Sequence, residues 1–576
     1  MLDFLGCIVF VFRIKRKKKI RNELKRTVRR TTPRTTAPDR LRGRPGVDGP
    51  GDRVLNQALP GEVDVLVVGG GINGAGIARD LAGRGVRVLV CEKDDLAQHT
   101  SSASTKLIHG GLRYLEYYEF SLVRKALAER EVLLKGAPHI MWPLRFVMPH
   151  DASMRPVWMI RAGLFLYDHL AKREVLAGSR TVSLREHPAG APLKPQYKRG
   201  FVYSDGWVDD ARLVVLNARD AADRGATVLT RWRCIDAQRG DNAWRVTLQA
   251  GDGRTHTLTA RALVNAAGPW AAQFLAEGTH APRARSLRLV KGSHIVVRKL
   301  FDHDHAYIFQ NPDRRIIFAI PYQDGEFTLI GTTDVEHHGA IGDARIDDSE
   351  IAYLCEQASR YFAKPVVPAD VVWTYSGVRP LLDDESGDPS AVTRDYSLEL
   401  DTSKAPLLSV WGGKITTFRK LAEEAADLLA APLGSTRGAW TAGAFLPGGD
   451  LSVWIGDPQR PDTDFARFEQ AFALRHPQLP AAMRHRLARC YGSRVQELLA
   501  NGAGAEVVPG LHEAELNYLH DHEWAREPDD VLWRRTKLGL HLTPAQREEV
   551  ARWCAQHWRG TPGATPQTRP SETSWN

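Results

Sequence analysis

The sequence predicts an α/β protein in which one discontinuous domain holds an inserted antiparallel β domain and precedes a helical C-terminal region. Residues 63–95 run from an apolar strand through a glycine turn and a helix to a second apolar strand, which is the pattern of a βαβ unit. Strand–glycine–helix passages recur at Gly268 and Gly412, far along the chain. Two β-rich runs joined by Asp324 and Gly325 predict a hairpin between these returns.

The first unit predicts a binding site for an adenine dinucleotide. Gly69 permits a tight turn after the strand, Gly71 lets a pyrophosphate approach the backbone, and Gly74 lets the helix pack closely on the sheet. Glu92 ends the second strand, where a carboxylate can bind a ribose hydroxyl. Because glycines often form only a turn, the prediction depends on the complete order of strand, glycines, helix, strand and acid.

The returning passages set the expected domain boundaries. Gly268, and Gly412 with Gly413, suit a close approach of the backbone to a dinucleotide, although an ordinary strand-to-helix crossing also explains the small residues near Gly268. Residues 54–434 are expected to hold a nucleotide-binding domain, in segments at about 61–115, 200–285 and 370–434. A substrate domain is expected to be inserted in it, at about 116–199 and 286–369. A helical C-terminal domain at 435–560 and a polar tail at 561–576 are expected to follow.

The net positive charge of the chain belongs to its first 53 residues. Residues 1–53 hold 16 Lys and Arg against 5 Asp and Glu, so that 62 of the 78 basic and 63 of the 68 acidic residues remain for the rest. The rest has no general attraction for nucleic acid, and no nucleic-acid partner is expected. We expect residues 1–53 to be a disordered basic extension. A basic helix on an anionic membrane and a segment upstream of the true translation start are the alternatives.

The six cysteines are widely scattered and form no CxxC pair. Such spacing argues against a disulfide framework and against a structural zinc site, so no metal is expected. It is typical of a protein from the reducing cytoplasm. No uncharged stretch reaches the length of about 18 residues that a membrane span needs.

Segments beyond the glycine motif carry a resemblance to a known family. They occur in the family's order and include TSSASTKLIHGGLRYLEYYEF, YSDGWVDDARL, LVKGSHIVV, IGTTDVE, WTYSGVRPLLDDES, TRDYSLE, GGKITTFRKLAEEA and DHEWAREPDDVLWRRTKLGL. Over about residues 62–560 the chain resembles the FAD-dependent glycerol-3-phosphate dehydrogenases of the aerobic, respiratory type. One departure is Phe418, where the family usually has tyrosine. The phenolic hydroxyl is absent at this position, while packing of the ring can persist.

The resemblance implies a glutathione-reductase-like FAD-binding domain with a β-rich substrate domain. It implies oxidation of sn-glycerol 3-phosphate to dihydroxyacetone phosphate by hydride transfer to FAD, with electrons passing to ubiquinone. An oxidase that uses oxygen is the alternative, and a homodimer is left open. The implied location is cytoplasmic, peripherally on the inner face of the cytoplasmic membrane. Residues 154–173 are the candidate for membrane contact, and a buried amphipathic core helix explains their pattern at least as well.

The chemistry of this substrate explains which residue types its site needs. Arginine binds two phosphate oxygens at once, and a hydroxyl proton must leave as the carbonyl forms. The resemblance implies substrate binding by Arg113, Tyr114, Arg379, Arg394, Lys414 and Thr416. It implies catalytic roles for Arg379, Lys414, His294 and His109, with the base open among the two histidines and Lys414. Cofactor contacts are expected from Ser101, Ser102 and Ser104, for which a turn or cap is the alternative, and from Gly69, Gly71, Gly74, Glu92, Gly268, Gly412 and Gly413.

Overall fold

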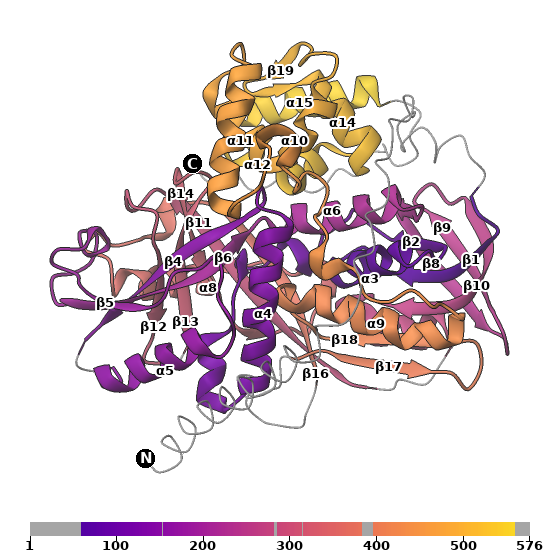
Figure 1. The fold of residues 1–576 in the computed structure, drawn as a ribbon, viewed down its shortest axis with the longest axis horizontal. Coiled ribbons are helices and arrows are strands. Elements are labelled where there is room, and N and C mark those ends of the chain that lie inside the picture. Colours follow the sequence, from indigo (N-terminus) through magenta and orange to yellow (C-terminus); the bar gives the residue numbers. More distant parts are fainter. Residues whose placement is uncertain (1–58, 152–153, 281–284, 314, 383–394, 559–576) are drawn as a thin grey trace, which may run out of the picture.

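Two large sheets lie side by side in this protein, and a helical C-terminal domain sits above them in the view of Figure 1. The computed structural model describes residues 59–151, 154–280, 285–313, 315–382 and 395–558. The predicted basic extension and the polar tail lie outside the described residues.

The first sheet has eight strands and contains the predicted βαβ unit. Its order is β17-β18-β10-β1-β2-β7, with β9 joined to β10 and β8 joined to β9. The pairs β10–β1, β1–β2, β2–β7 and β10–β18 are parallel, which is why the central strands are almost continuously apolar. The bounds are β1 (Glu62–Val68), β2 (Val88–Glu92), β7 (Thr227–Thr230), β8 (Trp232–Arg239), β9 (Trp244–Ala250), β10 (Thr255–Asn265), β17 (Ser397–Asp401) and β18 (Leu407–Trp411).

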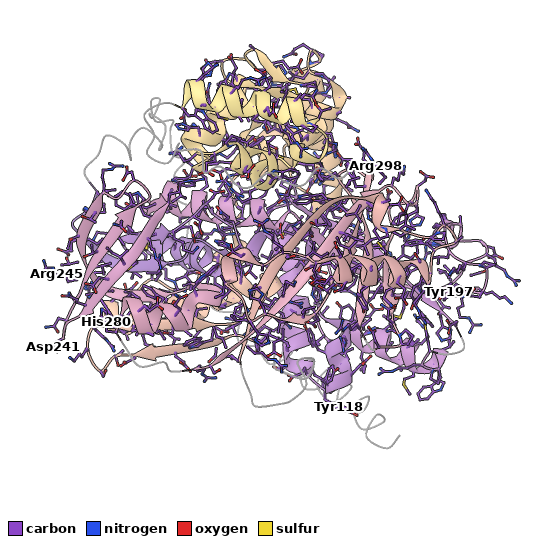
Figure 2. All side chains as sticks on the ribbon, turned by 180° about the vertical axis from the view of Figure 1, so that it is seen from behind. Tyr118, Tyr197, Asp241, Arg245, His280 and Arg298 are labelled. Carbon is purple, nitrogen blue, oxygen red and sulfur yellow. The ribbon has the colours of Figure 1, made fainter. Side chains whose placement is uncertain are left out.

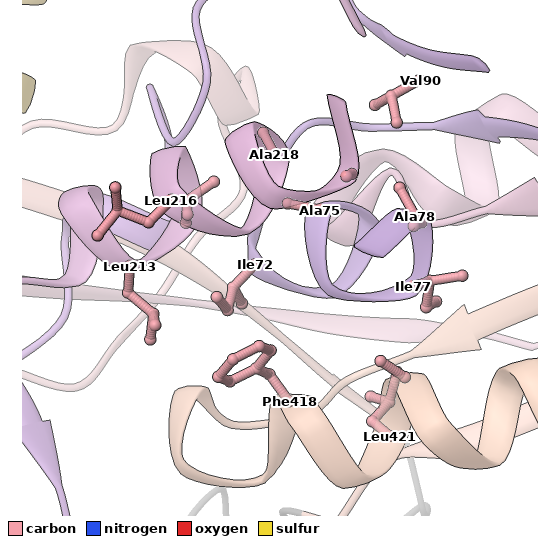
Figure 3. Close-up of a cluster of buried hydrophobic side chains, with 14 of the residues drawn as sticks. Ile72, Ala75, Ile77, Ala78, Val90, Leu213, Leu216, Ala218, Phe418 and Leu421 are labelled. Carbon is pink, nitrogen blue, oxygen red and sulfur yellow. The ribbon is translucent and has the colours of Figure 1, made fainter. Parts of the chain in front are cut away.

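Three helices pack together around the first unit and bury a large apolar core. They are α3 (Ile72–Gly83), α6 (Asp210–Asp223) and α9 (Phe418–Leu433). Ile72 of α3 faces Phe418 of α9 in this core (Figure 3). A Cβ atom on Gly76 would lie 2.9 Å from the ring of Phe418, so the ring fills the space that the glycine leaves. Phe418 is therefore a packing residue of the core.

The second sheet has ten strands and is antiparallel except where β12 runs parallel to β4. Its order is β15-β11-β14-β13-β12-β4-β6-β3, with β16 joined to β11 and β5 joined to β6. The predicted hairpin is confirmed, because β13 and β14 pair on either side of Asp324 and Gly325. The bounds are β3 (Leu107–Ile108), β4 (Met141–His150), β5 (Arg180–Ser183), β6 (Arg199–Val208), β11 (Leu287–Arg298), β12 (Ala306–Gln310), β13 (Ile316–Tyr322), β14 (Phe327–Gly331), β15 (Val335–Glu336) and β16 (Val371–Leu382).

The chain crosses between the sheets at points that differ from the predicted boundaries. Residues 200–285 and 370–434 were expected in the nucleotide-binding domain, yet β6 pairs with β4, and β16 pairs with β11. These two strands belong to the second sheet. The reason is physical: long-range pairing decides which sheet a strand joins, and the apolar pattern of a strand does not specify its partner.

The C-terminal domain has an apolar core of its own, built mainly from aromatic and leucine side chains. Its elements are α10 (Ser452–Ile455), α11 (Pro461–Arg475), α12 (Ala481–Tyr491), α13 (Val495–Leu498), β19 (Glu506–Val508), β20 (Leu511–His512), α14 (Glu513–Glu523), η10 (Asp530–Arg535) and α15 (Pro544–His557). Among the described residues, no helix combines the length and apolar character needed to cross a bilayer.

Candidate active site

A cavity, the nucleotide cleft, opens at the carboxyl ends of β1, β2 and β10. The three predicted glycine passages meet there. Gly69 and Gly71 contribute from the first passage, Gly268 from the second, and Gly412 with Gly413 from the third. Ligands of open parallel sheets bind at this edge, so the structure brings the expected backbone segments together in the expected place.

Two glycines of the first passage leave no room for side chains, one in the cleft lining and one directly behind it. Gly69 has a φ of +114°, and a Cβ atom there would lie 2.5 Å from the carbonyl oxygen of Ala266. A Cβ atom on Gly74 would lie 1.9 Å from the carbonyl oxygen of Gly69. Gly74 lines no part of the cleft, and its function is the close packing of α3 on β1.

The start of α3 is suited to a bound anion. The helix begins after Gly71, whose lack of a side chain leaves the first turn open to a ligand. Asn73, which no predicted motif marked as a binding residue, also lines the cleft. Its Nδ2 donates to the carbonyl of Gly412, while its buried Oδ1 has no hydrogen-bond partner among the described atoms. The glycine cradle and this orphaned oxygen fit a dinucleotide.

Glu92 lines the cleft and also fixes the glycine turn to β2. Its carboxylate accepts hydrogen bonds from the backbone N–H of Gly70 at 2.6 Å and of Asp94 at 2.9 Å. Burial raises the pKa of Glu92, and the two N–H donors partly oppose that effect. The predicted ribose-binding acid is thus also a structural residue of the turn.

The three predicted serines have different neighbours. Ser101 lines the nucleotide cleft, and its Oγ accepts from the backbone N–H of Ile72 at 3.0 Å. Ser102 donates to the carbonyl of His99 and lies outside the cleft lining. Ser104 donates to Asp210 at 2.7 Å. Only Ser101 is placed for direct contact with a ligand in the cleft.

A second pocket continues from the cleft towards the second sheet. The two cavities share lining from residues on both sides of the junction, namely Ile72, Thr100, Ser101, Pro380, Gly412 and Gly413. Its polar lining includes two of the predicted cofactor contacts, Ser101 and Ser104. It also includes five of the predicted substrate-binding and catalytic residues, namely His109, Tyr114, His294, Arg379 and Lys414. A ligand in the second pocket therefore lies next to the inner end of the nucleotide cleft.

Two cations of the second pocket come from different sheets. Arg379 lies on β16, and its Nη2 donates to the carbonyl of Thr333 at 3.0 Å and to Asp334 at 3.1 Å. Lys414 follows β18, and its Nζ lies 3.8 Å from the ring centre of Tyr114. Two cations that converge on one pocket can bind a phosphate dianion.

His294 of β11 is buried beside these cations. Its Nε2 lies 2.9 Å from the hydroxyl of Thr105, and its ring stacks on Tyr375 with centroids 4.7 Å apart. Burial, followed by the charges of Lys106 and Arg379, lowers the pKa of His294 well below its usual value. The imidazole is therefore neutral near pH 7 and can accept a proton.

The remaining predicted substrate residues are placed differently. Thr416 is buried and lines neither cavity; its Oγ1 accepts from the backbone N–H of His109 at 3.1 Å and so positions that residue. Arg113 lies on η2 (Leu112–Tyr117) with its Nη2 3.4 Å from the hydroxyl of Tyr117, and it is absent from the lining of both cavities. Arg394 lies outside the described residues.

One buried ion pair behind the second pocket was missed by the sequence analysis. Lys106, only 1% exposed, donates to Asp210 at 2.9 Å and to the carbonyl of Ser102 at 2.7 Å. Its Nζ also lies 4.6 Å from the ring centre of Tyr375, on which His294 stacks. Both residues stand inside the quoted segments TSSASTK and WVDD, but nothing local indicates that a lysine and an aspartate 104 positions apart are paired.

Comparison with known proteins gives consistent matches along the chain. A family described as FAD dependent oxidoreductase matches residues 64–419, and the C-terminal domain of alpha-glycerophosphate oxidase matches residues 439–559. A glycerol-3-phosphate dehydrogenase of Pseudomonas aeruginosa is 53% identical over 85% of this chain and 94% of the relative. The aerobic glycerol-3-phosphate dehydrogenase of Escherichia coli is 51% identical, covering 86% and 97%.

One further relative and one solved structure are also similar to this chain. A D-erythritol 1-phosphate dehydrogenase of Brucella abortus is 50% identical over 86% of this chain and 98% of the relative. The crystal structure of a glycerol-3-phosphate dehydrogenase from Bacillus halodurans complexed with FAD superposes with a TM-score of 0.69 and 28% identity, covering 87% of this chain and 91% of that chain.

Proposed function

The chain belongs to the FAD-dependent glycerol-3-phosphate dehydrogenases, and from that premise we propose that it oxidises sn-glycerol 3-phosphate to dihydroxyacetone phosphate. The predicted family, FAD-dependent fold and cofactor are confirmed by the matching family and by the related structure that contains FAD. The observation that carries the proposed substrate is the second pocket, where Arg379 and Lys414 converge beside a neutral His294.

The residues of the nucleotide cleft are suited to hold FAD. The open first turn of α3 after Gly71 would bind the pyrophosphate, and Glu92 would bind the ribose. Bound FAD supplies the acceptor for a hydride. The protein contributes the position and polarisation of the substrate beside it.

The side chains of the second pocket would bind the substrate and remove its hydroxyl proton. Arg379 and Lys414 would neutralise the phosphate and stabilise charge on the oxygen that becomes a carbonyl. His294 would take the hydroxyl proton on a ring nitrogen, because its lowered pKa keeps it neutral. Its Nδ1 has no hydrogen-bond partner among the described atoms. His109, in the same pocket, is the alternative base.

Replacing Arg379 with alanine tests the proposed substrate site. We expect Arg379→Ala to keep bound FAD but to slow flavin reduction by sn-glycerol 3-phosphate by about 100-fold or more, since a charge-stabilising donor is lost. Anaerobic stopped-flow bleaching of the flavin measures this. The control is Arg245→Ala, on the exposed face of β9 at an outer edge of the molecule (Figure 2). Bleaching of Arg379→Ala at the wild-type rate would exclude Arg379 from the reaction.

The same assay should also be carried out with D-erythritol 1-phosphate, because one relative is named for that substrate. The dehydrogenase from Brucella abortus is about as similar to this chain as the glycerol-3-phosphate enzymes, and its name gives D-erythritol 1-phosphate as its substrate. We expect sn-glycerol 3-phosphate to give the higher kcat/KM. A higher value for D-erythritol 1-phosphate would reverse the assignment while leaving the phosphate-binding cations in place.

For the electron acceptor we propose ubiquinone, with the protein bound peripherally to a membrane surface. The edge opposite the C-terminal domain supports this: Tyr118 projects there (Figure 2), and Trp158 and Phe165 of α5 (Val157–His169) are 58% and 42% exposed. Their exposure favours the interfacial interpretation of residues 154–173 over a buried helix.

Turnover with ubiquinone in anionic vesicles should exceed peroxide formation in air. Dominant peroxide formation would identify an oxidase.

A further inference from the structure

One charged segment of the C-terminal domain, residues 526–537, reaches the back of the nucleotide cleft; we call it the docking segment. It includes the π-helical turn η10 and lies within the sequence DHEWAREPDDVLWRRTKLGL, to which the proposed reaction gives no role. The domain that carries it sits above α6 in Figure 1. The segment also contacts the second sheet, since Trp533 stacks on Trp373 of β16 with centroids 4.9 Å apart.

The first contact of the docking segment is with Asp95, two residues beyond Lys93 of the cleft lining. The side chain of Asp95 is fully buried and accepts from Arg534 Nε at 2.6 Å and from Arg535 at 2.6 and 2.8 Å. Burial alone would raise the pKa of Asp95, but the charges of Arg535 and Arg534 outweigh it and keep the carboxylate ionised. A buried carboxylate of this kind depends on both guanidinium partners.

The second contact is with Arg231, which begins the other wall of the cleft. Arg231 Nη2 donates to both oxygens of Asp530, at 2.8 and 3.1 Å, and Asp530 also pairs with Arg534. The backbone N–H of Arg231 donates to the carbonyl of Asp94 at 2.9 Å. Asp95 and Asp530 are therefore joined through Arg534, and the two walls are joined to each other.

The segments held in this way form much of the cleft surface. Residues 97–101 line one wall and residues 232–235 line the other. Asp95 and Arg231 themselves are absent from the cleft lining, so they affect the cleft through the lining residues that follow them in the chain. The backbone N–H of Asp95 donates to Gln98 Oε1 at 3.1 Å, which links the buried ion pair directly to a lining residue.

We propose that the C-terminal domain is a clamp on the nucleotide cleft, in which Arg534, Arg535 and Asp530 are positioning residues that set how tightly FAD is retained. The clamp fixes both walls from behind and touches neither the cofactor position nor the substrate pocket. The proposal requires that the cleft binds FAD, and it is independent of which substrate is oxidised.

The test compares two lysine substitutions in the full-length holoenzyme. Arg535→Lys removes the two-point contact with Asp95, whereas Arg486→Lys removes an equivalent two-point contact with Glu515 inside the C-terminal domain, away from the cleft. FAD release is followed by the rise in flavin fluorescence after dilution, below the unfolding temperature of each variant. Hydrogen exchange of residues 93–101 and 231–235 is the second measurement.

We expect Arg535→Lys to speed FAD release by about tenfold and to raise exchange in both wall segments, because the broken pair is fully buried. Arg486→Lys should lower the unfolding temperature while leaving FAD release within about twofold of wild type. Equal acceleration in both variants, or none in Arg535→Lys, would overturn the clamp. If Arg535→Lys does not fold, Arg534→Gln replaces it, since that side chain is 13% exposed and contacts the same carboxylate.

Discussion

The nucleotide cleft and the second pocket differ in what forms them. The cleft is formed largely by backbone, at glycine turns where even a methyl group would clash, as at Gly69, while Gly74 behind it lets α3 pack closely on β1. The second pocket is formed by side chains from separate strands, with His294 on β11, Arg379 on β16 and Lys414 after β18. Substitutions in the cleft should therefore damage folding and cofactor binding together, while substitutions in the pocket should remove turnover from a folded flavoprotein.

The largest effect is expected directly behind the cleft, from Gly74→Ala. The new Cβ would lie 1.9 Å from the carbonyl oxygen of Gly69, so α3 must shift away from β1. We expect a loss of about 1–3 kcal/mol or more in the free energy of unfolding and a protein largely without flavin. The flavin-to-protein absorbance ratio and the unfolding temperature measure the two consequences.

The matched control for that change is Gly163→Ala in α5, where a Cβ atom would meet nothing within 4 Å. Alanine at an unstrained helical position should stabilise the protein by about 0.5–1 kcal/mol. Normal flavin content in Gly74→Ala would show that the backbone of the cleft is less constrained than its packing indicates.

A smaller change in stability and a large change in rate are expected in the pocket, from His294→Asn. The amide can keep a hydrogen bond to Thr105 but cannot take a proton, so flavin reduction should slow by about 100-fold or more with FAD retained. His109→Asn should slow flavin reduction less if His294 is the base.

Because the pKa of His294 lies well below 6.5, the wild-type rate should not fall as the pH is lowered through 6.5. An acidic limb near pH 6.5 that disappears in His294→Asn would contradict this protonation state.

The same contrast explains how much could be predicted from the sequence. The cleft is encoded in contiguous segments, so Gly69, Gly71 and Glu92 were identified from their spacing alone. The second pocket is not encoded in contiguous segments. Nothing local distinguishes Arg379 or Lys414 among the 78 basic residues, so the family resemblance was needed to choose them.

Neither the spacing of residues nor the family resemblance predicted the direction in which individual side chains point. Thr416 turns its hydroxyl to the backbone of His109 and lies outside the pocket lining. Arg113 lies beside Tyr117 on η2 and is likewise absent from that lining. The pair of Lys106 and Asp210 is set by long-range packing, as are the crossings of β6 and β16 into the second sheet.

The smallest effect is expected outside both regions, at His485 of the C-terminal domain. His485 lies 2.5 Å from Glu469 and 3.1 Å from Asp324 at the tip of the β13–β14 hairpin, and its hydrogen bonds to these acids raise its pKa to about 9. Since the unfolded value is about 6.5, its stabilisation is fully present below pH 6.5 and is lost as the pH rises through 9.

Replacing His485 with glutamine should therefore lower the unfolding temperature at pH 6 and leave it unchanged well above pH 9. The side chain is 34% exposed, so we expect about 1 kcal/mol or less. Flavin content and the rate of flavin reduction should match wild type at every pH, because neither cavity contains this residue. Unfolding measured from pH 6 to 10 checks the titration. A difference that persists at pH 10 would mean that packing, and not the charge on His485, joins the C-terminal domain to the hairpin.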